Sequence, residues 1–409
     1  MELTHIEDLA SPRFTAEVHA MRAAMQPLAD AGTLDAGELH RDAAEDTGLT
    51  DFGPDDYRER LDVLLEAMRG VEGITPLGTF GFRTQVVQLL KNRLLLIDLL
   101  RRRPEIHEIE LAPPIIIAGL PRTGTTHLHN LMAADPAFRT LPYWESLEPF
   151  PRPLESGVEP DPRRTRTDAA VWFMNQTMPL FPLMHEMTTD HVHEEIQLLA
   201  IDFSTMFFET LAALPDWQAY YRSHDQTPHY QFLRTTLQAL QHVRPGGRWL
   251  LKSPQHLEQL PVLATVFPDA TVVVTHRDPV EVVVSMATMV AYSARSHADV
   301  VDPVRIGRAW ADRIEVLLSA CVRDRDAIPP DRSLDVRFAD LLADDLAIAR
   351  HVYRLAGQPL TTVGEEAMAK YLAGHVRGRL GRIDYRAADV GLDPAELRVR
   401  FASYTECFL

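Results

Sequence analysis

Residues 115–126 decide the fold and read Ile-Ile-Ile-Ala-Gly-Leu-Pro-Arg-Thr-Gly-Thr-Thr. The run Ile115–Ala118 is typical of a strand buried in a parallel sheet, and a helix is expected over Thr125–Ala134. Gly119 and Gly124 allow a tight turn between them, so that several backbone N–H groups point to one place at the N-terminus of the helix. The stretch therefore predicts a binding site for a phosphate or a similar anion.

The loop has the spacing of the phosphate loop of nucleotide triphosphatases, G-x-x-x-x-G-K-[ST], but Thr125 stands at the position of the lysine. A triphosphatase needs that lysine, and an acidic residue after a later strand to hold magnesium. Here the later strands lead into basic residues instead, Lys252 and Arg277, and Arg122 lies in the loop itself. Three cations around one anion site indicate an anionic ligand that is neutralised by protein charge rather than by a metal.

Strands and helices alternate from residue 113 onward, which predicts a parallel sheet covered by helices on both faces, that is, a three-layer α/β sandwich. Residues 1–112 are expected to form an N-terminal helical region, and residues 113–409 the α/β domain with a helical insertion at about 143–245. The further strands expected are Arg248–Lys252, Thr271–Thr275 and Leu334–Phe338. The helices expected are Phe14–Ala29, Tyr57–Arg69, Arg83–Arg103, His191–Leu214, Pro228–Val243, His256–Phe267, Pro279–Val290 and Val304–Asp326. The polar stretch Asp35–Asp56 is expected to hold a short helix at most.

Composition excludes several classes of protein. The 409 residues include 41 Lys and Arg and 58 Asp and Glu, a net charge of −17, which argues against binding to nucleic acid or to anionic lipid. The two cysteines, Cys321 and Cys407, are too few for a disulfide framework or a Cys-rich zinc site. The N-terminus lacks the pattern of a signal peptide, and no apolar run reaches the roughly 20 residues of a membrane span. We therefore expect a cytoplasmic protein without membrane insertion.

Four motifs in order resemble those of sulfotransferases that use 3′-phosphoadenylyl sulfate (PAPS). The segment 120–126 looks like their loop P-[KR]-[ST]-G-[ST]-[ST], and residues 272–285 look like their strand–x-R-[ND]-P-x(5)-S–helix motif. Trp249-Leu-Leu-Lys-Ser-Pro254 is similar to the strand whose lysine faces the sulfuryl group. Arg377-Gly-Arg-Leu-Gly-Arg382 is similar to the loop that closes over the 3′-phosphate.

The resemblance implies a fold of the P-loop type and transfer of a sulfuryl group from PAPS, with 3′-phosphoadenosine 5′-phosphate (PAP) as product and no metal. It implies that Arg122 and Lys252 neutralise the transferred group and the leaving phosphate, as catalysis by charge neutralisation requires. It implies that Arg277 and Ser285 bind the 3′-phosphate. The residues expected to bind the donor are Arg122, Thr123, Gly124, Thr125, Thr126, Arg277, Ser285, Arg377, Gly378 and Arg379.

The general base that takes the proton of the acceptor is less clearly marked. Many small-molecule sulfotransferases have a histidine two residues after the strand lysine, but here that position is Pro254. His256 lies two residues further on. Glu145 lies 23 residues after Arg122 and resembles the glutamate of the tyrosylprotein type, so Glu145 and His256 are the first candidates, followed by Glu194 and Glu195.

His185, His191 and His193 are potential metal ligands that lie close together in the sequence. They do not fit H-E-x-x-H, and on a helix His191 and His193 would face different sides, so the segment predicts a helix start that lines the acceptor pocket. That pocket is expected in residues 143–230 and 290–305. Its aromatic residues favour an apolar small molecule carrying a hydroxyl or an amine, and they are Trp144, Trp172, Phe173, Phe181 and Tyr292. Two alternatives stay open: a kinase with an altered loop, and a non-catalytic protein that binds adenosine phosphates.

Overall fold

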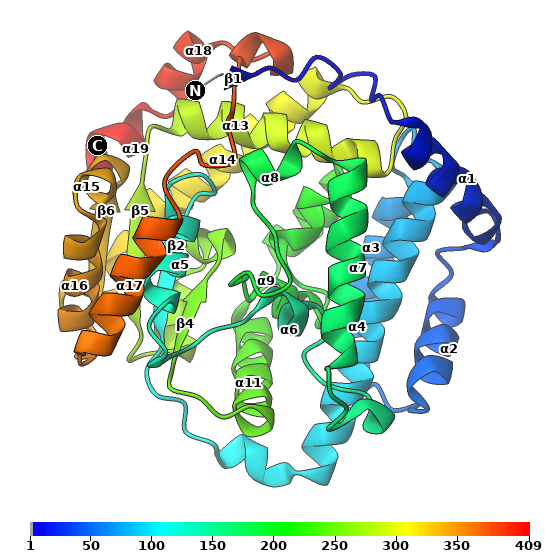
Figure 1. The fold of residues 1–409 in the computed structure, drawn as a ribbon, viewed down its shortest axis with the longest axis horizontal. Helices are drawn as coiled ribbons and strands as arrows, with labels where there is room; N and C mark the ends of the chain where they lie inside the picture. The colour runs from blue at the N-terminus through cyan, green and yellow to red at the C-terminus, as the bar shows by residue number, and fades with distance from the viewer. Residues whose placement is uncertain (1–2) are drawn as a thin grey trace.

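The computed structural model describes residues 3–409, and its centre is a sheet of five parallel strands (Figure 1). The strands stand in the order β3-β4-β2-β5-β6. Their bounds are β2 (Ile115–Gly119), β3 (Phe138–Arg139), β4 (Arg248–Lys252), β5 (Thr271–His276) and β6 (Ser333–Arg337). Ile117 pairs with Lys252 and Gly119 with Thr275, so β2, β4 and β5 end at the same edge of the sheet. The motifs that follow these strands are brought together there.

Alternate residues of the strands face two different helical layers, as expected for a sheet buried on both sides. Ile115, Ile117 and Val273 pack with α5 (Thr125–Ala133), α15 (Phe338–Ala343), α16 (Asp345–Leu355) and α17 (Thr362–Gly374). Ile116 and Val272 face the larger core on the other side. That side holds α11 (Thr227–Val243), η4 (Pro254–Glu258), α12 (Leu260–Val266), α13 (Pro279–Ser293) and α14 (Pro303–Asp324). The predicted three-layer α/β sandwich is thus confirmed.

The N-terminal region contains four helices, which lie on the opposite side of the molecule from α15–α17 (Figure 1). They are α1 (Ala16–Ala31), α2 (Ala36–Thr47), α3 (Tyr57–Arg69) and α4 (Pro76–Arg102), followed by η1 (Pro104–Glu108). Apolar residues of α2, α3 and α4 belong to the same core as Ile116 and Val272. Arg60 of α3 and Arg93 of α4 also bond the buried carboxylate of Asp202 at 2.9 and 2.8 Å. The helices therefore pack as one body with the α/β part.

Between β3 and β4 the chain forms a series of helices and loops. It contains α6 (Tyr143–Leu147), η2 (Pro153–Glu155), α7 (Pro162–Thr177), α8 (Phe181–Met184), α9 (Ile196–Ala200), η3 (Met206–Thr210) and α10 (Pro215–Ser223), and it ends with α11. The remaining elements are η5 (Ala294–Ser296), η6 (Arg325–Ala327), η7 (Pro330–Arg332), η8 (Ala387–Val390), α18 (Pro394–Arg400) and α19 (Ala402–Phe408). A small parallel pair, β1 (Leu3–Thr4) with β7 (Arg382–Ile383), joins the N-terminal segment to the tail.

Two predictions about helices are wrong. The stretch 35–56 holds a helix of 12 residues, α2, whose buried stripe is only Leu39 and Ala43, too narrow to stand out among polar neighbours. The expected helix His191–Leu214 is instead a loop, the short α9 and the 3-10 turn η3. Phe203 breaks it with a left-handed backbone (φ 53°). Since this stretch is buried almost all round, its apolar pattern could not separate a helix from irregular chain.

Candidate active site

The phosphate loop, residues 119–126, follows β2 and leads into α5. Gly119 and Gly124 have left-handed backbones (φ 146° and 93°), and a Cβ on Gly119 would lie 2.3 Å from the Thr275 hydroxyl. The Thr123 hydroxyl bonds that of Thr275 at 2.6 Å and is fully buried, so Thr123 ties the loop to β5 rather than facing a ligand. Arg122 also has a positive φ of 70°, a strained conformation that occurs at functional sites.

The predicted cations gather around this loop. The Lys252 ammonium lies 3.3 Å from the Thr126 hydroxyl and forms an ion pair with Glu194. Arg122 donates from Nε to the Ser285 hydroxyl at 3.0 Å, and Arg277 donates to the backbone carbonyl of Arg122 at 2.8 Å. The structure therefore brings together the residues that the sequence assigned to the two ends of the donor.

Arg277 and Arg377 form one corner of this site. Their guanidinium carbons lie 4.4 and 5.4 Å from the centre of the Phe338 ring. Burial, with repulsion from Arg382 and Arg277, lowers the pKa of Arg377, which is the signature of cations gathered in one place. The next residues in the tail loop turn away from the pair: Gly378 has a left-handed backbone, and Arg379 pairs with Glu186.

A cavity of about 870 Å³ opens from the carboxyl ends of β2, β4 and β5. At one end it is lined by the phosphate loop, Lys252, Arg277 and Arg377. Most of the remaining lining is apolar and comes from α4, the insertion and α13, including Leu77, Phe80, Phe173, Phe207 and Met286. The arrangement holds an anion against one end of an apolar chamber.

The sulfotransferase family model matches residues 113–362 of this chain. The chain belongs to the sulfotransferase family. Sulfotransferase STF1 from Mycobacterium tuberculosis superimposes on it with a TM-score of 0.78 and 32% identity, covering 90% of this chain and 98% of that one. Sulfotransferase STF9 from Mycobacterium avium gives 0.82 and 26%, covering 92% and 97%. The omega-hydroxy-beta-dihydromenaquinone-9 sulfotransferase Stf3 of Mycobacterium bovis is 26% identical over 64% of this chain and 67% of its own length.

Membership of the family establishes sulfuryl transfer from a sulfonate donor and sets aside the kinase and the non-catalytic binding protein. The spatial match to STF1 and STF9 spans about nine-tenths of the chain, so these relatives share more than the α/β domain. In the described residues 3–409, no helix is long and apolar enough to cross a membrane.

Two of the predicted catalytic residues of this sulfotransferase lie outside the cavity lining. Glu145 is almost fully buried, and its carboxylate receives paired hydrogen bonds from Arg139 at 2.8 and 2.9 Å and from Arg244 at 3.0 and 2.7 Å. His256 is also buried: Nδ1 bonds the Tyr230 hydroxyl at 2.8 Å, and Nε2 bonds Glu195 at 2.5 Å. Neither group has a free polar atom that faces the sulfuryl position.

Glu194 and Glu195 are placed differently from each other. Glu194 lines the cavity beside Lys252. Glu195 is buried behind it and accepts the backbone N–H of Lys252 at 2.9 Å as well as the bond from His256. Burial opposes ionisation of Glu195, but the hydrogen bond and positive charge of His256 hold its pKa below the ordinary value. Glu195 and His256 thus position Lys252, while Glu194 faces the chamber.

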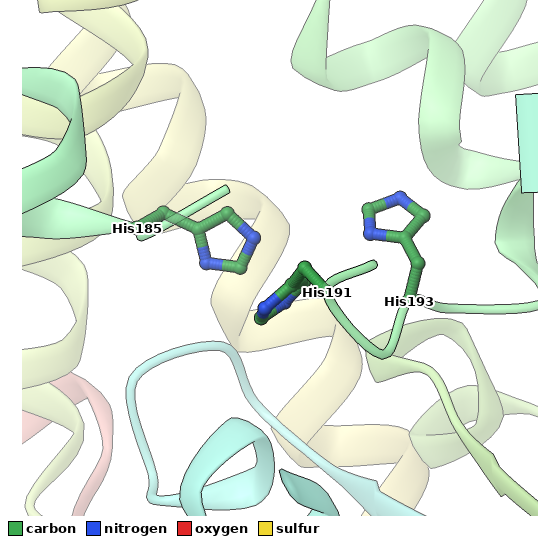
Figure 2. A group of neighbouring side chains, drawn as sticks. All are labelled: His185, His191 and His193. Carbon is green, nitrogen blue, oxygen red and sulfur yellow. The ribbon is translucent and has the colours of Figure 1, made fainter. Parts of the chain in front are cut away.

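The histidines form the part of the site that sequence reasoning missed. Residues 185–195 are an irregular loop, not a helix, so the argument that placed His191 and His193 on different sides fails. His185, His191 and His193 instead converge (Figure 2), with one nitrogen from each within 4.8 Å of the others. Burial, assisted by the charge of Lys252, lowers the pKa of His191 to about 4, and burial takes those of His185 and His193 well below their ordinary value.

The predicted acceptor segments supply much of the chamber, but α1 and α4 were not foreseen. Arg22 and Met25 of α1 and residues 77–85 of α4 line the cavity. Of the aromatic residues expected there, Phe173 and Phe181 do so, whereas Tyr292 is buried in α13. The only available signal was the pair of glycines Gly78 and Gly81 in the first turns of α4.

Proposed function

We propose that this sulfotransferase moves the sulfuryl group of PAPS to the hydroxyl of an apolar small molecule. The observation that carries the proposal is the cavity in which the phosphate loop and Lys252 close one end of a chamber lined by apolar side chains. A donor bound at the loop would present its sulfuryl group to that chamber. An acceptor with a hydroxyl at one end and an apolar body fits the remaining space.

The donor end fits PAPS. The backbone N–H groups of the loop and the hydroxyls of Thr125 and Thr126, both of which line the cavity, would hold the 5′-phosphosulfate. Arg277 and Arg377, gathered over Phe338, would bind the 3′-phosphate. A phosphate held by arginines needs no metal ion, since two guanidinium groups already supply the charge.

The side chains that line the acceptor end of the cavity favour an apolar acceptor molecule. The relative Stf3 is named for an omega-hydroxy dihydromenaquinone, and the same kind of acceptor suits a chamber lined by phenylalanine, leucine and methionine. Because α4 supplies Leu77 and Phe80, we include residues 1–112 in the catalytic unit beside the α/β domain 113–409. Both cysteines are free, which supports a reducing compartment such as the cytoplasm.

In the transfer step, the acceptor oxygen bonds to sulfur while the bond from sulfur to the bridging phosphate oxygen breaks. Lys252 stabilises the charge on the sulfuryl group and the leaving phosphate, which departs as PAP. Glu194 is the carboxylate that faces the chamber beside Lys252. We assign to it the role of the base that takes the hydroxyl proton.

Thermal unfolding with PAP or AMP tests the donor, because only PAP carries the 3′-phosphate. PAP at ~100 times Kd should stabilise the protein by roughly 2.7 kcal/mol, with or without EDTA, and AMP should do much less. Stabilisation by ATP-Mg but not by PAP would overturn the donor assignment. Incubation with radiolabelled PAPS and a panel of isoprenoid alcohols, sterols, phenols and sugars then tests the acceptor. Label in sugars alone would contradict an apolar acceptor.

A further inference from the structure

The loop between α8 and α9 contains three histidines whose rings face one space (Figure 2). The ring centres of His185 and His191 are 5.6 Å apart, and those of His191 and His193 are 6.3 Å apart. One nitrogen of each ring lies within 4.8 Å of the other two. Five residues of the chain separate His185 from His191 and one separates His191 from His193, yet the loop brings all three rings together.

Within residues 3–409, no side-chain hydrogen bond is recorded for any of these rings, and Nδ1 of His193 is fully buried without a partner. Buried polar atoms are nearly always paired, and each exception asks for an explanation. Another buried histidine of this site, His256, has protein partners at both nitrogens, Glu195 and Tyr230, and His129 has one, the carbonyl of Leu250 at 3.3 Å. The three rings lack such partners.

We propose that His185, His191 and His193 bind a divalent transition-metal ion of the zinc type, with a fourth position open to the cavity. Three imidazoles and one open position are the ligand set of many catalytic zinc sites. His185 and His193 both line the cavity, so the open position meets the chamber and not the core. The ammonium of Lys252 does not repel the ion with its full charge, because it is paired with Glu194.

The metal site goes beyond the proposed function, because the phosphate loop and the arginines hold the donor without a metal ion. His193 is the chain neighbour of Glu194, the residue assigned as base. An ion here would bind the acceptor oxygen, and a divalent ion makes such an oxygen more acidic. The proton that the oxygen releases passes to Glu194, and the oxygen bonds to sulfur while the bond from sulfur to the bridging phosphate oxygen breaks and PAP leaves. The ion would thereby place the hydroxyl beside Lys252.

Cobalt gives a direct test, because tetrahedral Co²⁺ bound by imidazoles absorbs visible light. The full-length protein, stripped with chelator, is titrated with CoCl₂ and then with ZnCl₂. We expect one Co²⁺ per chain and loss of the absorption as Zn²⁺ replaces it. His191→Ala and His193→Ala should each weaken Co²⁺ binding by at least about 100-fold, because loss of a ligand exceeds the effect of losing an outer partner. The matched control is His375→Ala, an exposed histidine that bonds the carbonyl of Tyr371.

Absence of the absorption in the wild-type protein, or equal Co²⁺ affinity in His191→Ala, overturns the proposal. Stabilisation by PAP shows that a variant is folded. If an alanine variant is not folded, Co²⁺ binding is measured instead with His191→Asn, which keeps a polar group of similar size. The two proposals fail separately. A protein that binds Co²⁺ but not PAP would contradict the donor assignment, and one that binds PAP but not Co²⁺ would contradict the metal site.

Discussion

The two ends of the cavity are built in different ways. The donor end is made by residues that directly follow β2, β4 and β5, whose register places Lys252 beside Ile117 and Thr275 beside Gly119. The acceptor end is made by α1, α4, α13 and the loops of the insertion, which are far apart in the chain and have no common register. A parallel sheet fixes the first end through a continuous register of backbone hydrogen bonds, whereas side-chain packing and isolated backbone bonds, such as that from Tyr143 to His191, fix the second.

Within the site, some residues act on the reacting groups, and others only hold those residues in position. At the donor end Lys252 is positioned by Glu195 through its backbone N–H. At the acceptor end Glu194, on the same loop as the histidines, points into the chamber. Substitutions at the two ends should therefore affect different kinetic constants, and buried ion pairs outside the cavity should affect stability alone.

The largest effect is expected for Glu194→Gln, which keeps the shape of the side chain and removes its basicity. It should lower kcat by roughly 10²–10⁴ and leave the stabilisation by PAP intact. Steady-state rates at saturating donor and the melting temperature with PAP measure the two effects. Near-normal turnover would remove Glu194 as the base and direct the search to the histidines.

Glu145→Gln should act on stability instead. Its carboxylate neutralises Arg139, which is fully buried, and the partly exposed Arg244. Breaking one side of a buried pair costs about 3–5 kcal/mol, because the remaining charge stays uncompensated. Urea unfolding measures the loss, with the exposed Glu72→Gln as control. A fall in kcat without loss of stability would return Glu145 to the candidates for the base.

Most of the donor end could be predicted from the sequence because short motifs carry it. Arg122, Lys252 and Arg277 each follow a recognisable strand, and parallel strands bring their carboxyl ends together. The acceptor end could not be predicted in the same way. The apolar residues of 191–214 have no decisive period, so the predicted helix there is wrong. A helix would keep His191 and His193 on different sides, and the convergence with His185 is visible only in the structure. Glu145 has the right distance in sequence from the loop, but its carboxylate is paired with the buried Arg139 and with Arg244.

Arg277→Ala tests the donor end more finely. Loss of charge-assisted hydrogen bonds to a phosphate costs about 1.5–3 kcal/mol, which corresponds to about 10- to 100-fold weaker donor binding. Calorimetric titration with PAP measures this, and kcat at saturating PAPS should change little. Arg305→Ala, at an exposed ion pair with Glu72, is the control. Lost turnover with unchanged PAP affinity would mean that Arg277 interacts with the sulfuryl group and not with the 3′-phosphate.

The smallest effect is expected at the acceptor end, for Phe80→Leu on α4. Phe80 lines the apolar chamber far along the chain from every donor motif. Removing part of its ring forfeits about 1 kcal/mol of apolar contact, so the KM for the acceptor should rise about fivefold while the KM for PAPS stays the same. Leu28→Ala, an exposed residue of α1, should change neither constant. Equal changes in the two KM values would show that Phe80 supports the whole fold and does not bind the acceptor specifically. The N-terminal helices would then have no assigned role in the acceptor site.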